Sequence, residues 1–170
     1  NLAVIATTGQ MAMYSNGQVV FVFPDAPAAE HKIHFIMAQN PSAGAVLLIG
    51  GNPVDDIPEL LKYPLRRLVH LELDPAVREM LASLHMNKRE CHPRDPRLEL
   101  RLGDATRFAA QTDDKFDIII VEAPGPSTIA MNRFYTVEFY RGIRRILAPG
   151  GFFTTALDSS EDLLDETAGV

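Results

Sequence analysis

The stretch from Ala45 to Gly51 reads A-V-L-L-I-G-G, a short apolar run that ends in two glycines. About twenty residues further on, a second apolar run carries the acidic residue Glu72. A buried parallel strand, a glycine turn, a helix and a second strand ending in a carboxylate form the nucleoside-binding half of a Rossmann-like sheet. Glycine lets the backbone approach a ligand closely, and a carboxylate can accept both ribose hydroxyls. Gly50, Gly51 and Glu72 are therefore candidate nucleoside-binding residues.

The residues that follow Gly51 depart from this motif, because Asn52-Pro53-Val54 stands where further glycines are expected. Proline removes a backbone donor and fixes φ, and valine disfavours the positive φ that glycine adopts freely. Asp55 and Asp56 come next and could supply a carboxylate to the altered loop. Asp56 is also placed to cap the following helix, with Glu59 completing a capping box.

Composition narrows the class of protein. The 170 residues are 46% hydrophobic and 22% charged, with a net charge of -6. This is the balance of a globular domain, and the negative charge argues against nucleic acid as a partner. No run approaches the roughly 18 uncharged apolar residues that span a bilayer, so no membrane contact is expected of this segment. The single cysteine, Cys91, excludes an intrachain disulfide and fits a reducing, cytoplasmic location.

Three β-type runs open the chain at 2–6, 11–14 and 19–23. Asn16-Gly17 between the last two is a strong hairpin signal, because both turn positions need positive φ. These runs predict a small antiparallel meander.

Strand-like and helix-like segments alternate after residue 28, which predicts a parallel sheet with right-handed crossovers and the strand order 3-2-1-4-5. Asp74-Pro75 and Thr136 are the expected starts of two of the helices. The expected strands are 45–49, 67–73, 98–102, 117–121 and 152–157, with a turn at 149–151, and the expected helices are 28–39, one from 57, 75–85, one around 108–110 and 137–147.

The ordered set of these features resembles the spermidine synthase family, the polyamine aminopropyltransferases, and in part a divergent bacterial spermidine synthase-like subgroup. The resemblance implies a fold of the S-adenosylmethionine-dependent methyltransferase type with an N-terminal β meander. The segments that carry it are Asn16-Gly17, Ile49-Gly50-Gly51, Glu72-Leu73-Asp74, Asp95-Pro96-Arg97, Gly103-Asp104, 116–119, 132–139 and 147–151.

The resemblance also implies a chemistry. In that family decarboxylated S-adenosylmethionine donates an aminopropyl group to an amine by in-line displacement at carbon, and methylthioadenosine leaves. The attacking amine must be deprotonated, so a carboxylate base is required beside it. Either this donor or S-adenosylmethionine is the expected co-substrate, a polyamine is the expected acceptor, and no metal is expected.

Residue by residue, the resemblance assigns five positions besides the glycines. Glu72 matches the acid that binds the ribose, and Asp104 with Ala105 matches the Gly-Asp-Gly segment that binds the adenine amino group. Glu122 falls on the position of the catalytic base, one methylene longer than the family's aspartate. His34 matches the histidine of a substrate-binding Tyr-His-Glu triplet.

Three other matching positions have lost their polar groups. Pro53, Ile33 and Gly125 stand where the family has an aspartate, a tyrosine and an aspartate. We therefore expect transferase chemistry with a degraded catalytic site, so the enzyme status stays open. The alternatives are a methyltransferase that uses S-adenosylmethionine and a catalytically silent nucleoside-binding or dimerisation module.

The expected organisation is a meander over residues 1–24, a Rossmann-like domain over 28–158 and a tail over 159–170. Because the chain opens at Asn1 without a methionine, we expect it to be a soluble part of a longer protein. A homodimer is also expected, since the last strand would otherwise be an exposed sheet edge.

Overall fold

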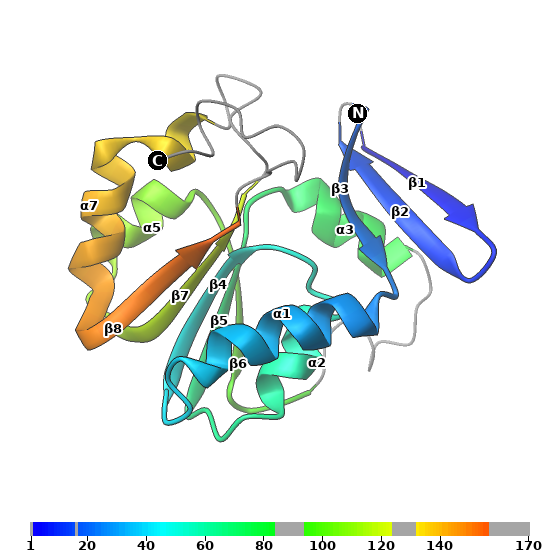
Figure 1. Ribbon diagram of the computed structural model, residues 1–170. Coiled ribbons are helices and arrows are strands. Elements are labelled where there is room, and N and C mark those ends of the chain that lie inside the picture. Colours follow the sequence, from blue (N-terminus) through cyan, green and yellow to red (C-terminus); the bar gives the residue numbers. More distant parts are fainter. Residues whose placement is uncertain (1, 16, 84–93, 124–131, 157–170) are drawn as a thin grey trace, which may run out of the picture.

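The computed structural model describes residues 2–15, 17–83, 94–123 and 132–156. Asn16, Cys91, Gly125, the expected end of the third helix and the tail lie outside these ranges. Figure 1 shows a five-stranded sheet flanked by helices, with a small three-stranded sheet to one side. The strands are β1 Leu2–Thr7, β2 Gln10–Ser15, β3 Gln18–Phe23, β4 Ala45–Gly50, β5 Arg67–Glu72, β6 Leu98–Leu102, β7 Phe116–Glu122 and β8 Leu147–Thr155; the helices are α1 Ala26–Ala38, α2 Asp56–Leu61, α3 Pro75–Ser83, α5 Ala105–Gln111, the 3-10 turn η1 Arg133–Tyr135 and α7 Val137–Ile146.

The large sheet has the order β6-β5-β4-β7-β8, and all four pairings are parallel. The predicted order 3-2-1-4-5 and the fold class are therefore confirmed. β4 lies at the centre, between β5 and β7, so the ends of these three strands meet at one edge.

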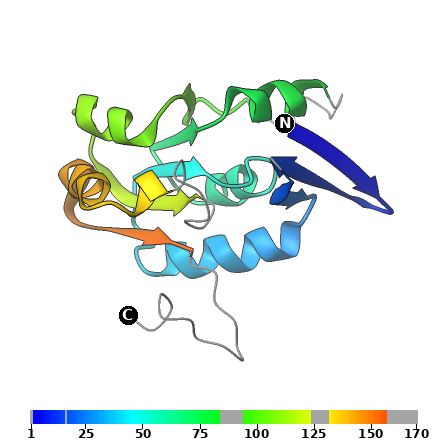
Figure 2. The same ribbon diagram turned by 90° about the horizontal axis from the view of Figure 1, so that it is seen from above.

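Apolar residues on the two faces of the sheet form two cores. One core packs α1 and α2 on the sheet, and the other packs α5 and α7 on the opposite face. Figure 2 shows the sheet between α1 on one side and α5 on the other. β4 contributes to both cores through alternate buried residues, Val46 and Leu48 on one face and Leu47 and Ile49 on the other. This burial on both faces explains why its sequence is an unbroken apolar run.

The antiparallel meander β1-β2-β3 forms a third apolar cluster, together with the loop after β4 and with α3. Met13, Phe21 and Phe23 from the meander pack against Val54 and against α3. The meander therefore covers the region where β4 and β5 end.

Two helix starts agree with the sequence. Thr136 Oγ1 accepts a hydrogen bond from Phe139 N at the start of α7, and Asp74 Oδ1 accepts one from Ala76 N at the start of α3. The predicted cap of α2 is wrong. Asp55 holds the N-cap position without a side-chain cap, and Asp56 is the first helical residue. The carboxylate of Asp56 points elsewhere because Lys32 binds it.

The last strand also starts earlier than predicted. β8 begins at Leu147, so the expected turn at 149–151 lies within the strand. Gly150 has φ +76°, and the pairing with β7 shifts register between Phe116 and Ile118. A Cβ on Gly151 would lie 2.9 Å from Asp117 O, so the glycines let an irregular segment stay against β7.

Candidate functional site

The two glycines at the end of β4 bring three chain segments into close contact. Gly50 and Gly51 have φ values of +68° and +80°, which L side chains rarely adopt. A Cβ on Gly50 would lie 2.5 Å from Glu122 O, and one on Gly51 would lie 3.1 Å from Asp56 Oδ2 and 3.2 Å from Glu122 Oε2. The glycine pair is thus required by the protein's own packing.

The altered loop after Gly51 attaches the meander to the sheet. Asn52 Nδ2 donates to Val22 O of β3 at 3.0 Å and to Asp55 Oδ2 at 2.8 Å, while Asn52 Oδ1 accepts from Val54 N at 3.2 Å. Val54 is buried with the meander's aromatic residues. In the motif, the residues at these positions would contact the tail of a nucleoside. In this chain they hold β3 in place.

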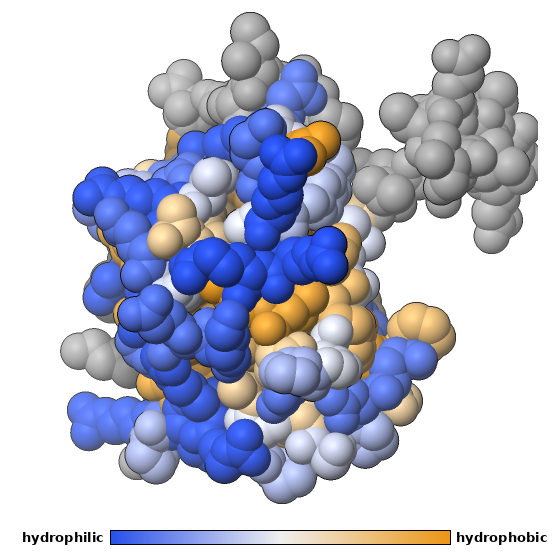
Figure 3. All heavy atoms as spheres, turned by 90° about the vertical axis from the view of Figure 1, so that its left-hand side faces the viewer, coloured by the Kyte–Doolittle hydropathy of each residue, from blue (hydrophilic) through white to orange (hydrophobic). Residues whose placement is uncertain are grey.

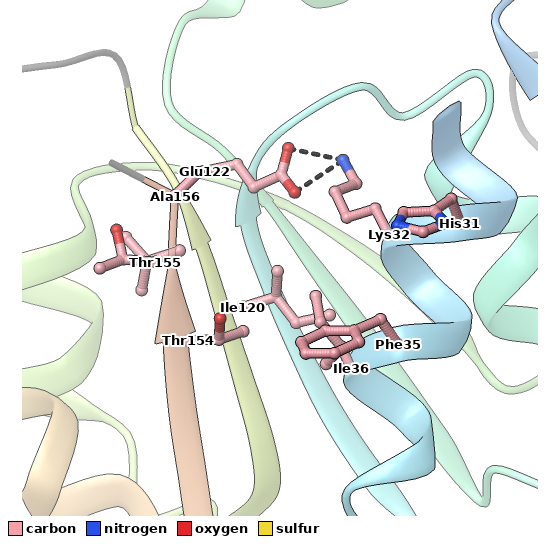
Figure 4. A pocket seen from close by; sticks show the side chains of 10 residues that line it. His31, Lys32, Phe35, Ile36, Ile120, Glu122, Thr154, Thr155 and Ala156 are labelled. Atoms are coloured by element: carbon pink, nitrogen blue, oxygen red, sulfur yellow. Dashed lines mark hydrogen bonds and ion pairs between the residues drawn. The ribbon is translucent and has the colours of Figure 1, made fainter. Parts of the chain in front are cut away.

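A three-residue ion cluster lies beside this loop and joins α1, α2 and β7. Lys32 Nζ lies 2.6 Å from Glu122 Oε1 and 2.9 Å from Asp56 Oδ1, and it donates to the other oxygen of each carboxylate. Figure 4 shows Lys32 and Glu122 facing each other across the space between α1 and β7. Asp56 also accepts from Asn52 N at 2.9 Å. One ammonium therefore serves two carboxylates.

Burial dominates the electrostatics of this cluster. It raises the pKa of Asp56 from 3.8 to about 6, although Lys32 opposes the shift. Burial alone would lower the pKa of Lys32, but Asp56 and Glu122 outweigh it and raise that pKa above its usual value. Lys32 therefore stays charged, and the raised pKa of Asp56 favours protonation of this carboxylate on mild acidification.

Glu72 lies at the end of β5, on the neighbouring strand. Its Oε1 accepts hydrogen bonds from Leu73 N at 2.8 Å and Asp74 N at 3.0 Å. Burial raises the pKa of the Glu72 carboxyl despite these two bonds. The backbone of the next turn thus fixes the orientation of the carboxylate.

Glu72 also lines a cavity at the carboxyl edge of the sheet, roofed by the meander. The lining residues are Ser15, Val20, Phe21, Gly50, Gly51, Glu72, Leu73, Asp74, Val77 and Glu122. The structure therefore brings together four of the seven predicted site residues, namely both glycines and both glutamates.

Asp104 and Ala105 lie at the same edge, just after β6. Asp104 caps α5, with Oδ1 accepting from Arg107 N, and its Oδ2 lies 3.0 Å from Arg133 Nη1. Ala105 is fully buried and packs in the core beneath α5. Neither Asp104 nor Ala105 is among the described residues that line the cavity.

The structure does not place His34 with Glu72 and Glu122 in the lining of the cavity under the meander. Its Nδ1 is hydrogen-bonded to the Tyr63 hydroxyl, and its Nε2 lies 3.4 Å from Glu59 Oε2. These partners belong to α2 and the segment that follows it. His34 is thus part of the contact between α1 and α2.

Glu122 also borders a second pocket, between α1 and the strands β7 and β8. Its volume is about 350 Å³, and its lining includes His31, Lys32, Phe35 and Ile36 from α1. The Lys32–Glu122 ion pair thus stands between the cavity under the meander and this α1–β8 pocket.

Sequence reasoning did not find Lys32. A lysine in a helix carries no motif, and its two partners lie 24 and 90 positions away. The only available signal was its place next to Ile33, which is the first residue of the triplet used for the resemblance. In the described part of the chain, no group of three metal-ligating side chains occurs, and no helix has the length and apolar character to cross a membrane.

Comparison with known proteins shows the family of this chain. Residues 28–164 match the family model described as the spermine/spermidine synthase domain. A polyamine aminopropyltransferase from Oceanobacillus iheyensis is 31% identical over 148 residues, covering 82% of this chain and 28% of that protein. A polyamine aminopropyltransferase from Nitrosomonas europaea is 34% identical over 135 residues, covering 76% of this chain and 40% of that protein.

Solved structures show the same fold. A spermidine synthase in complex with the transition state analogue AdoDATO superimposes with a TM-score of 0.73 at 24% identity, covering 85% of this chain and 50% of that one. CalS10, an S-adenosylmethionine-bound amino pentose methyltransferase from Micromonospora echinaspora, gives 0.56 at 22% identity, covering 82% and 53%. The chain thus spans about half of these structures and less than half of the two relatives above. On the extent of the family match and on these identities, the chain belongs to the spermine/spermidine synthase family.

Proposed function

We propose that this domain binds the nucleoside of decarboxylated S-adenosylmethionine and transfers its aminopropyl group to an amine with low efficiency. The observation that carries the proposal is the cavity under the meander, where Gly50, Gly51, Glu72 and Glu122 converge. Family membership supports the donor class, as does the spermidine synthase neighbour that holds AdoDATO. The relatives' names indicate a polyamine as the acceptor.

Glu72 is the proposed anchor for the ribose. Two backbone amides already fix its carboxylate, and fixed acceptors bind a diol without losing further side-chain freedom. Asp104 is the proposed partner of the adenine amino group. It would have to share its carboxylate with Arg133, which lies 3.0 Å away.

The acidic residues favour the decarboxylated donor over S-adenosylmethionine. The methionine carboxylate of the latter needs cations or free backbone amides. Here Asn52 N is taken by Asp56, Pro53 has no N–H, and Glu122 lies nearby. Methyl transfer is the second candidate. The methyltransferase CalS10 shares the fold of this chain, and the likeness is one of fold alone.

Low efficiency is proposed because Glu122 is already engaged. Both of its carboxylate oxygens contact Lys32 Nζ, so an acceptor amine must compete with Lys32 for the base. Glu122 is also one methylene longer than the family's aspartate. A displacement of about 1 Å can cost about 10²-fold in rate.

Calorimetric titration tests the binding step. Methylthioadenosine and decarboxylated S-adenosylmethionine should bind, and Glu72→Gln should weaken both by about 10- to 100-fold through loss of charged hydrogen bonds. Glu99→Gln, on the next strand and outside the cavity, is the matched control and should leave both affinities unchanged.

Turnover with putrescine tests the chemical step. We expect a rate about 10²-fold below that of the Nitrosomonas europaea relative assayed in parallel. Binding of S-adenosylmethionine alone would favour the methyltransferase alternative. A failure of all three nucleosides to bind would leave the silent module, and a rate equal to the relative's would show that the site is intact.

A further inference from the structure

The ion cluster carries an uncompensated negative charge. Asp56 and Glu122 supply two carboxylates, and Lys32 supplies one ammonium. The cluster therefore contains one more carboxylate than it has ammonium groups. Asp56 is 1% exposed, whereas the Glu122 side chain is 18% exposed. A second cation would therefore be attracted to the cluster, and Glu122 is the member it can reach.

The α1–β8 pocket leads to this carboxylate, and its walls are apolar. Figure 4 shows Phe35 and Ile36 from α1, Ile120 from β7 and Thr154 from β8 bordering one space beside the Lys32–Glu122 pair. The volume of about 350 Å³ falls at the lower end of the range for small-molecule sites. The pocket thus has a largely apolar body and a polar end, where the Glu122 carboxylate lies beside Lys32 and His31.

The surface on the α7 and β8 side of the fold also combines apolar and polar residues. Figure 3 shows the face that carries α7 and β8, where an apolar area is surrounded by hydrophilic residues. Phe35 is 68% exposed, which is a large exposed fraction for a phenylalanine side chain. Its ring stands at the pocket, where an apolar ligand would cover it.

We propose that the α1–β8 pocket binds a primary monoamine with an apolar stem of about four to six carbons, whose ammonium pairs with Glu122 as the second cation of the cluster. This inference rests on the proposed function only in naming the acceptor class. It narrows the acceptor from polyamines to amines with one charge, because a second ammonium would lie among Phe35, Ile36 and Ile120. Burying a charge without a charged acceptor is costly, and away from Glu122 the described lining offers neutral acceptors such as the hydroxyls of Thr154 and Thr155.

Calorimetric titration without any donor tests the pocket on the wild-type chain at neutral pH. The probes are butylamine, hexylamine, putrescine and hexanol. Each buried methylene strengthens binding up to about fourfold, so hexylamine should bind up to about 15-fold more tightly than butylamine. Putrescine has the four carbons of butylamine but carries a second ammonium, so it should bind more weakly. Hexanol lacks the cation and should bind at least about tenfold more weakly than hexylamine.

Two matched variants locate the binding. Phe35→Ser should weaken hexylamine by about three- to tenfold while sparing butylamine, because the longer stem reaches the ring. Phe153→Ser removes an exposed phenylalanine from β8 that does not line the pocket, and it should change neither affinity. Glu122→Gln should abolish the preference for hexylamine over hexanol.

The proposal is overturned if putrescine binds as tightly as hexylamine, if hexanol matches hexylamine, or if the two phenylalanine variants behave alike. Tight putrescine binding would leave the proposed aminopropyl transfer standing, with a polyamine acceptor. Conversely, hexylamine binding on a chain that binds no nucleoside would support this pocket and refute the proposed function.

Discussion

Replacing Lys32 by methionine tests the ion cluster most directly, because methionine keeps the length of the side chain and removes its charge. The variant leaves Asp56 and Glu122 facing each other with no cation between them. Breaking a buried ion pair costs about 3–5 kcal/mol. The Lys32 side chain is 33% exposed, so solvent screening reduces the expected loss in the free energy of unfolding to about 2–3 kcal/mol at pH 8.

The loss should depend on pH, and its sign follows from Asp56. In the native state the pKa of this carboxyl is about 6, against an ordinary value of 3.8. The native protein therefore binds a proton that the unfolded chain has released, and the contribution of Asp56 to wild-type stability falls as the pH rises from about 4 to about 6. Without Lys32 the pKa rises further, so the variant loses stability over a window that extends above pH 6. At pH 5 its Asp56 is protonated, and the cost should shrink to about 1 kcal/mol.

Urea denaturation followed by far-UV circular dichroism at both pH values measures these losses, since the chain has no tryptophan. Lys62→Met is the matched control, because Lys62 also pairs with a buried carboxylate, Glu59, while its own side chain is 54% exposed. That variant should lose less stability than Lys32→Met at pH 8, because solvent screens the more exposed ammonium. A loss for Lys32→Met that is equal at pH 5 and pH 8, or no larger than the control's, would refute the reasoning.

Three further predictions concern the loop and the assembly. Gly51→Ala should destabilise the protein by about 2–4 kcal/mol, because it combines a positive φ with a Cβ 3.1 Å from Asp56 Oδ2. Gly9→Ala is the control, because its Cβ meets only open space at φ +91°. Equal losses of stability for the two variants would show that the close approach at Gly51 is unimportant. Asn52→Ala should cost about 2 kcal/mol and speed amide exchange in β3, since it removes the bond to Val22 O; unchanged exchange would show that the loop does not hold the meander. The chain should form a homodimer, since β8 pairs only with β7 in the described sheet, and a clean monomer by gel filtration with light scattering would contradict this.

The sequence was sufficient to predict the fold of the large sheet. The parallel sheet follows from segments that alternate between strand and helix periodicity, with crossovers expected to be right-handed, and the order 3-2-1-4-5 expected for such a fold agrees with the structure. The glycine turn at Gly50 and Gly51 and the helix caps at Asp74 and Thr136 could also be predicted from the sequence. Each depends on a few neighbouring residues, whose conformational preferences are expressed locally.

The arrangement of the site was decided by tertiary structure. Lys32 binds Asp56 and Glu122, which lie 24 and 90 positions away in the sequence. The residues next to a lysine do not indicate which carboxylates it will bind. The same holds for Asn52, whose departure from the glycine motif indicated a lost ligand contact but whose side chain holds β3. Charge pairing and amide hydrogen bonds are available to any suitable partner. Only the packing of α1, α2 and the meander at one edge of the sheet selects which partners are within reach.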